Sequence, residues 1–222
     1  MIPSIEDIKK KMNPGFKIGA SFVDMGHPLD PERVYKQFME SYSVYYNLTR
    51  FDGSTGSVDA SGAGAESEAR SFSEGGDRDF IAEAVFDSKG EQYFLIKSAK
   101  IAETHTAEYV YFVREDELKA DRLKALDEKA WTEGVAHAKP AADHKNTDVV
   151  LIIISKSITG EARELVKSLK HSKVYKMAMH GFSNYRLVAV ETETGVAYFN
   201  KQARILKRLV GNILTEEKER VK

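Results

Sequence analysis

The chain has 222 residues, of which 42% are hydrophobic and 30% are charged, and its formal net charge is −1. This composition is typical of a soluble globular protein, and no apolar stretch approaches the roughly 18 residues that a membrane-spanning helix needs. Because the chain has no cysteine, disulfide bonds, thiolate metal ligands and cysteine nucleophiles are excluded.

The N-terminal part, residues 1–51, is expected to form helices that pack on the core. It begins without the basic and apolar regions of a signal peptide, so we expect a cytoplasmic location. Ser4 caps a short helix pattern that ends before Asn13, and apolar residues alternate over 16–24, which favours a strand.

A stronger helix pattern begins at Asp30, which precedes a proline at the first helical position. The periodicity of its apolar residues carries this helix to about Asn47. Aromatic residues at this spacing could stack bases or a planar ligand, but packing against a sheet is their commoner role. The stripe consists of Phe38, Tyr42, Tyr45 and Tyr46.

Residues 52–79 are rich in glycine, serine, alanine and acidic residues, with only Val58 and Phe72 as sizeable apolar residues. Such a segment buries too little surface to offset the entropy of ordering it, so a flexible insert or linker is predicted. Its glycine clusters look like phosphate-binding loops. However, no Gly-Lys-Ser/Thr follows them and no apolar strand precedes them.

The α/β core is expected over residues 80–215, with a frayed polar tail at 216–222. Its first half predicts a hairpin around a turn, then a third strand and a charged helix. These elements are Phe80–Phe86, Asp87–Gly90, Glu91–Lys97, Glu108–Arg114 and Asp116–Glu133.

The longest apolar run, from Val149 to Ile154, follows Asp148 and is rich in β-branched residues. A run this short suits a strand buried on both faces, at the centre of a sheet. Thr159 then caps a helix that ends near Lys170. The remaining pattern predicts strands at 174–179, 185–191 and 196–199, a turn at 180–184, and a final helix capped by Asn200.

The predicted order is helix, three strands, helix, strand, helix, strands, helix, which indicates a mixed α/β fold with a central mixed sheet flanked by helices. Helix, three strands, helix, strand is also the order of restriction-endonuclease-like enzymes. Those enzymes hold Mg²⁺ with an acid on the second strand and an acid-x-Lys motif on the third, for which this chain offers Asp87 and Glu117-Leu118-Lys119. Glu117 falls beyond the predicted third strand, so the resemblance is one of topology and we expect no cleavage.

Two other groups of residues weakly indicate a catalytic or metal-binding site. Gly181 to Tyr185 nearly matches a Gly-x-Ser-x-Gly nucleophile elbow around Ser183, but a strand follows it where an elbow needs a helix, so a hairpin turn is favoured. Polar residues near the third strand form the nearest approach to a metal-ligand set, with solvated residues at a strand end as the alternative. They are Glu103, His105, Glu108, Asp143 and His144. We expect no metal and no cofactor.

Charge is unevenly distributed. From Ser155 onward the chain has 14 basic and 7 acidic residues, a charge of +7, and the rest carries −8. Such a split indicates either two halves that attract one another or a face that binds polyanions. The candidate phosphate-contacting residues are Arg163, Lys167, Lys170, Lys173, Lys176, Arg204, Lys207 and Arg208.

The C-terminal half resembles a prokaryotic family of unassigned function in its strand patterns. The residues that carry the resemblance are Glu108–Phe112, Lys173–Met177, Arg186–Val190 and Asn200-Lys201. The resemblance brings no catalytic residues with it. We therefore expect a non-catalytic binding or structural module, with a protein partner or a second copy of the chain as its ligand. The alternatives are a nucleic-acid-associated protein with a degenerate nuclease-like fold, and an enzyme whose site is not readable from sequence.

Overall fold

The structure is a computed structural model that describes residues 15–51, 79–93, 100–141 and 144–215. The helix predicted near Ser4, nearly all of the predicted insert and the predicted frayed tail therefore lie outside the described residues. None of the described helices is long and apolar enough to cross a membrane.

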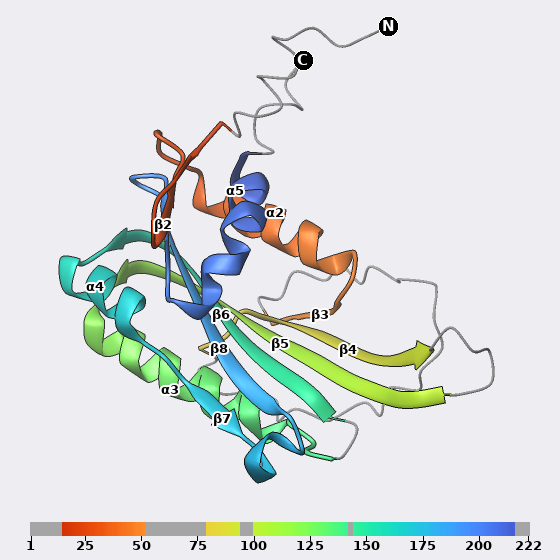
Figure 1. Cartoon of the computed structure of the whole chain (residues 1–222). Coiled ribbons are helices and arrows are strands. Elements are labelled where there is room, and N and C mark those ends of the chain that lie inside the picture. The colour runs from red at the N-terminus through yellow and green to blue at the C-terminus, as the bar shows by residue number, and fades with distance from the viewer. Residues whose placement is uncertain (1–14, 52–78, 94–99, 142–143, 216–222) are drawn as a thin grey trace, which may run out of the picture.

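The described strands form one mixed sheet of nine, in the order β1-β2-β9-β8-β6-β5-β4-β3, with β7 paired to β8 beside this path (Figure 1). The strands are β1 (Lys17–Ile18), β2 (Phe22–Asp24), β3 (Asn47–Arg50), β4 (Ala82–Tyr93), β5 (Lys100–Leu118), β6 (His144–Ile158), β7 (Ser172–Val174), β8 (Phe182–Glu191) and β9 (Val196–Phe199). The helices are α2 (Pro31–Ser43), α3 (Ala120–Ala136), α4 (Gly160–Ser168), the 3₁₀ turns η1 (Lys176–Ala178) and η2 (Gln202–Leu206), and α5 (Lys207–Thr215).

β6 is the central strand, as its apolar run predicts. It pairs in parallel with β5 on one side and with β8 on the other. Val150 and Ile152 enter one hydrophobic cluster, whereas Val149 and Leu151 enter the other. This division explains the unbroken apolar run, because a strand covered on both faces has no solvent-facing positions.

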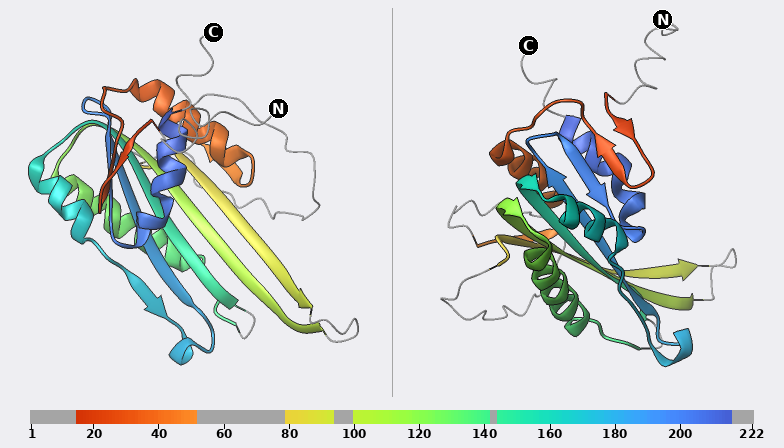
Figure 2. Two further views of the ribbon diagram at one scale, coloured as in Figure 1. Left: turned by 45° about the horizontal axis from the view of Figure 1, so that its top comes forward. Right: turned by 90° about the vertical axis from the view of Figure 1, so that its left-hand side faces the viewer.

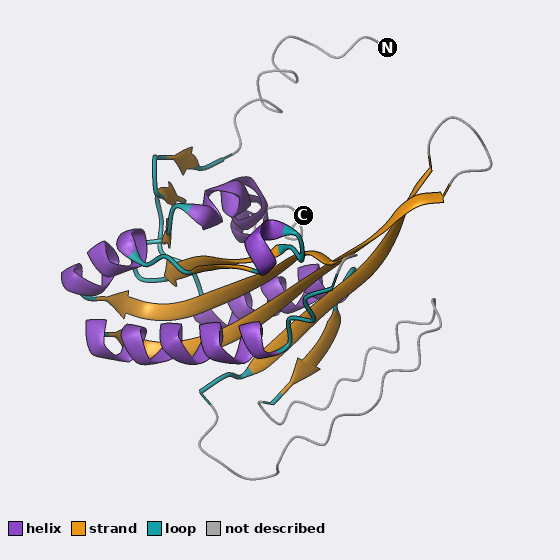
Figure 3. Cartoon of the chain, turned by 60° about the horizontal axis from the view of Figure 1, so that its bottom comes forward, coloured by secondary structure: helices purple, strands orange, loops and turns teal. Residues whose placement is uncertain are grey.

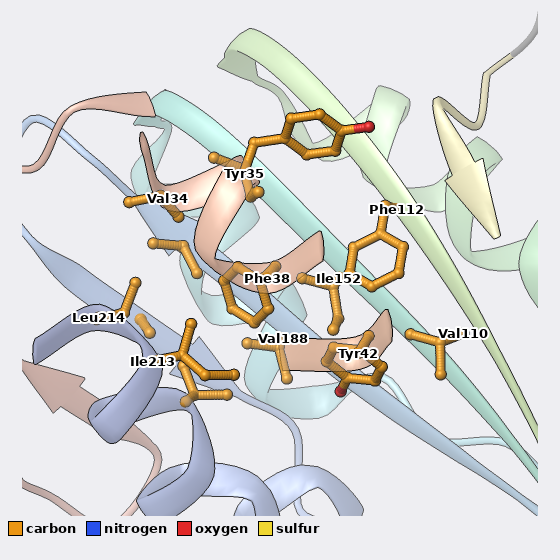
Figure 4. Packing of buried hydrophobic residues seen from close by; sticks show 14 of the residues in the cluster. Val34, Tyr35, Phe38, Tyr42, Val110, Phe112, Ile152, Val188, Ile213 and Leu214 are labelled. Atoms are coloured by element: carbon orange, nitrogen blue, oxygen red, sulfur yellow. The ribbon is translucent and has the colours of Figure 1, made fainter. Parts of the chain in front are cut away.

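Helices cover both faces of the sheet. α2 and α5 pack on one face and α3 and α4 on the other, as Figures 2 and 3 show. α2 begins where predicted, since the Asp30 side chain accepts a hydrogen bond of 2.8 Å from the Arg33 amide. Phe38 and Tyr42 of α2 pack on Phe112 of β5, so this part of the aromatic stripe is core (Figure 4). Tyr45, by contrast, is exposed.

The predicted mixed α/β fold is confirmed, but the predicted hairpin over residues 80–97 is wrong. β4 runs straight through the supposed turn at Asp87–Gly90 and stays in register with β5, from Ala82 opposite Phe112 to Gln92 opposite Ala102. Continuous pairing with a long neighbour outweighs local turn preference. The third strand of the unit is β3, which follows α2.

Three other boundaries are corrected. The strand expected over 16–24 is two short strands that pair with each other, joined by a turn in which the Gly19 amide donates to the Phe22 carbonyl. α2 ends at Ser43, so that β3 can begin at Asn47. α3 begins at Ala120, because β5 continues to pair with β6 as far as Leu118.

Candidate docking surface

The residues considered for a nuclease site do not meet. Asp87 lies opposite Ala107 in the register of β4 and β5, whereas Glu117 is ten positions further along β5. At about 3.3 Å per residue, this places the two carboxylates roughly 30 Å apart along the strand. Asp87 contacts His105 at 2.6 Å and Glu117 pairs with Lys119 at 3.1 Å, so each is used locally.

Ser183 is not a nucleophile at an elbow. It is fully buried within β8, and its hydroxyl lies 3.0 Å from the hydroxyl of Tyr175. Gly181 before it has a φ of 77° and forms the turn that the sequence favours.

A charged cluster lies across the three central strands, beside the C-terminal end of α2. Arg186 of β8 donates to Glu108 of β5 at 2.8 Å and to Asp148 of β6 at 2.7 Å. The exposed fractions of these three side chains are 14%, 16% and 9%. Asn184 and Tyr46 add hydrogen bonds to the two carboxylates.

The side chains of this cluster form hydrogen bonds with one another. Burial raises the pKa of the Glu108 carboxyl, and the Arg186 charge and the Tyr46 hydroxyl only partly offset that effect. Burial, together with the Glu108 charge, also raises the pKa of Tyr46. One arginine faces both carboxylates, and these hydrogen bonds hold β5, β6 and β8 in register.

His144 has a structural role of the same kind. Its ring Nδ1 lies 2.7 Å from the His180 carbonyl oxygen, which only accepts, so Nδ1 carries the proton. Nε2 then accepts from the Thr147 hydroxyl at 2.9 Å. Among the described residues, neither His105 nor His144 forms a hydrogen bond with Glu108. No group of three or more metal-ligating side chains occurs among these residues either. The side chain of Glu103 and all of Asp143 lie outside the description.

His144 instead anchors the connection between β7 and β8, which is the most unusual segment of the described chain. Residues 174–179 were predicted to be a strand, but β7 ends at Val174 and the turn η1 follows. Lys176 and Met177 have φ angles of 43° and 52°, the two positive values among described residues other than glycine. Each left-handed residue with a side chain costs about 1–2 kcal/mol.

Hydrogen bonds hold this strained connection in place. The Tyr175 amide donates to the Gly181 carbonyl at 3.0 Å, and the His180 amide donates back to the Tyr175 carbonyl at 3.2 Å. A β-carbon at Gly181 would lie 2.6 Å from the backbone carbonyls of His144 and Lys145, so the chain comes close to β6 here. The hairpin is therefore fixed from both sides.

This fixed hairpin displays apolar side chains to solvent. Val174 is 60% exposed, Met177 93%, Met179 71% and Phe182 39%. Val174 and Phe182 are opposite each other in the β7–β8 register, and the other two lie on the connection between them. We call these four residues the hairpin surface; β7 and its turn lie at the lower edge of the molecule in Figure 1.

A second group of exposed apolar residues lies where α5 meets β1 and β2, and comprises Ile18, Phe22, Ile205 and Leu209. The described chain begins at residue 15 and ends at residue 215 beside this group. We therefore do not interpret the exposed side chains of this second group as a docking surface.

The eight basic residues predicted to contact phosphate lie on both faces of the sheet. α4, which carries Arg163 and Lys167, is in the layer with α3, whereas α5, which begins at Lys207, is in the layer with α2. Arg163 donates to the buried Glu191 at 2.6 Å, and Lys167 pairs with Glu164. Lys207 donates to the carbonyls of Gly19 and Ala20, each at 2.6 Å.

The other five, Lys170, Lys173, Lys176, Arg204 and Arg208, form no ion pair with any residue that the structure describes. Three of them, Lys170, Lys173 and Lys176, lie in or next to the hairpin. Residue patterns alone did not identify the hairpin surface. The signal available was two methionines within four positions of a glycine, Met177 and Met179 before Gly181, and this pattern also fits a strand and its turn.

The comparisons with known proteins identify a family and no assigned role. The model of a family described as "Domain of unknown function (DUF8052)" matches residues 30–211. No curated protein and no solved structure matches the chain.

Proposed function

We propose that this chain, which belongs to the family described as "Domain of unknown function (DUF8052)", is a non-catalytic binding module that docks a protein partner on the hairpin surface. The observation that carries this proposal is the pairing of an exposed methionine with a strained backbone at one position. Met177 has 93% of its surface in solvent and a left-handed conformation.

Neither property stabilises the free protein. An exposed methionine buries no apolar surface, and a left-handed residue with a side chain raises the energy of the folded state. Strained residues persist where their surroundings fix them, and they cluster at binding and active sites. The hydrogen bonds of Tyr175 and His144 supply that fixation here.

The chemistry of the hairpin surface also fits a protein partner. Methionine is flexible and polarisable, and it recurs on surfaces that bind other proteins. A hairpin held rigid before binding loses little conformational entropy when it docks, which favours affinity.

The test is selection from a displayed library of random peptides, with the full chain as bait. The bait variants are Met177→Ser with Met179→Ser, and the control is Ile205→Ser, which changes an apolar residue that is 69% exposed elsewhere on the molecule. We expect the wild-type chain and the control to enrich the same peptides and the double variant to lose them. Equal enrichment by the double variant would refute the proposal.

Nucleic-acid binding through the eight basic residues stays a prediction. Its support is the five basic residues that pair with no described carboxylate. Arg163, Lys167 and Lys207 have partners within the protein, and the eight residues lie on both faces of the sheet.

A further inference from the structure

Resting on the proposed function, we infer that the partner presents an extended segment of alternating acidic and apolar residues, which adds as a strand to the free edge of β7. Three observations carry this inference: the charge around the hairpin, the unpaired edge of β7 and the kind of side chain that the hairpin exposes.

The first observation is charge. No acidic residue occurs between Glu164 and Glu191 in the sequence. Within this interval Lys170, Lys173 and Lys176 find no carboxylate among the described residues, and Lys173 instead lies 5.4 Å from the ring centre of Tyr175. The hairpin surface is therefore an apolar patch beside three positive charges that pair with no described carboxylate, and an acidic segment is complementary to it.

The second observation is the edge. β7 pairs antiparallel with β8, and no described strand pairs with its other side. Ser172, Lys173 and Val174 are all exposed. An exposed edge offers a row of backbone donors and acceptors, and proteins bind extended peptides there by adding a strand.

The edge and the hairpin surface are continuous. Side chains alternate along β7, so Val174 and Lys173 point to opposite sides of the strand. A partner strand beside β7 has the same alternation, with one set of side chains on the side of Val174 and the other on the side of Lys173. Apolar residues suit the first set and acidic residues the second.

The same observations disfavour two other occupants. In a symmetric pair of hairpins, the three lysines of each copy would face those of the other, which destabilises a dimer. Nucleic-acid surfaces bind by arginine or lysine together with stacking aromatic rings. The hairpin exposes methionine and valine, and Phe182 is its one exposed ring among the described residues.

The experiment is fluorescence anisotropy of the full chain with three labelled synthetic peptides of equal length. They alternate glutamate with valine, lysine with valine, and glutamate with serine. A fourth probe is the glutamate–valine peptide with every second backbone amide methylated, which removes the donors that strand addition needs. Labelled duplex DNA is the fifth probe.

We expect the glutamate–valine peptide alone to bind, and backbone methylation to abolish its binding. Reversal of charge at Lys170, Lys173 and Lys176 to glutamate should weaken binding on the order of tenfold or more. The control reverses three exposed lysines elsewhere, Lys36, Lys124 and Lys201, and changes the net charge equally. It should leave the affinity within about threefold of the wild-type value.

The other outcomes distinguish the proposed docking surface from the proposed partner segment. Equal binding of the lysine–valine peptide, lost in Met177→Ser with Met179→Ser, would overturn the acidic partner and leave the docking surface intact. Unchanged binding of the methylated peptide would overturn strand addition. Binding of the glutamate–serine peptide or of DNA that is insensitive to the methionine variants would overturn both the docking surface and the partner segment. Absence of binding by all five probes would overturn the inference about the partner.

Discussion

The strain at Met177 makes a prediction that runs against the usual effect of glycine. Replacement of an ordinary residue with glycine destabilises a protein by about 0.5–1 kcal/mol, because the unfolded chain gains freedom. Met177 has a φ of 52° and a ψ of 41°, a conformation that costs a residue with a side chain about 1–2 kcal/mol and costs glycine almost nothing. Met177→Gly should therefore stabilise the protein by roughly 0.5–1 kcal/mol.

Loss of the side chain subtracts little from this gain. A fully buried methionine contributes roughly 1.5–3 kcal/mol, and only 7% of Met177 is shielded from solvent, so its share is about 0.2 kcal/mol. For a chain of 222 residues, a gain of this size raises the Tm by roughly 1–4 °C. The assay is urea denaturation followed by tryptophan fluorescence, with Trp131 as the single reporter.

Met179 provides the matched control, because it is an exposed methionine in the same connection with a φ of −68°. No strain is relieved there, so Met179→Gly should destabilise the protein by roughly 0.5–1.5 kcal/mol. If both variants destabilise the protein equally, the left-handed conformation stores no strain and the argument for function from strain fails. A stabilised Met177→Gly variant that also loses peptide binding would show that stability is given up there for binding.

Three further predictions concern the supports of the hairpin and the layers around it. Arg186→Met leaves two buried carboxylates without a cation and should cost about 3–5 kcal/mol in urea denaturation, whereas Arg114→Met, which removes a partly exposed ion pair, should cost under about 1 kcal/mol. Gly181→Ala should cost at least about 2 kcal/mol, because φ is 77° and the added carbon meets backbone oxygen atoms at 2.6 Å; a smaller cost would contradict the close approach to β6. Burial, followed by the charge of Glu133, raises the pKa of Glu83 in the folded state, so the folded state holds this proton more tightly and stability falls as pH rises through that pKa. Glu83→Gln should therefore raise the free energy of unfolding at pH 7 and leave it unchanged below pH 4; a pH-independent effect would contradict the assignment.

The central part of the fold was readable from sequence because its signals are local. The apolar run from Val149 to Ile154 specifies a strand covered on both faces, and Asp30 with Pro31 specifies a helix start. Neither depends on what the rest of the chain does. The mixed α/β class follows from such elements in order, and the structure confirms it.

The errors lie where distant residues decide. Asp87 to Gly90 has the composition of a turn, but pairing with residues 104–107 of β5 keeps it extended. Asp116 to Leu118 has the charge pattern of a first helical turn, but pairing with β6 keeps it in β5. A single sequence contains the local preference and not the partner that outweighs it.

The hairpin surface was missed for a related reason. Val174 to Met179 is mostly apolar and precedes a turn signal, which predicts a strand, and nothing in that pattern indicates the left-handed backbone at Lys176 and Met177. The residues on either side of this pair, Tyr175 and His180, contact Ser183 of β8 and His144 of β6. A binding surface made by such contacts has no contiguous motif.

The uneven charge of the chain is only partly resolved within the fold. Some of the positive charge of the C-terminal part does pair with the acidic part: Arg186 with Glu108 and Asp148, and Lys156 with Asp116. Attraction between the two parts is therefore real where strands or their ends meet.

Part of the positive charge that pairs with no described carboxylate lies at one place. Lys170, Lys173 and Lys176 recur every third residue through a stretch with no acid. That stretch contains the strained methionine and the edge of β7 that pairs with no described strand. Charge, strain and an unpaired edge have separate physical causes, and none of them stabilises the isolated chain. A partner that is acidic, apolar and extended would satisfy all three at once, which is why the peptide titration with its methylated and charge-reversed controls is the decisive experiment.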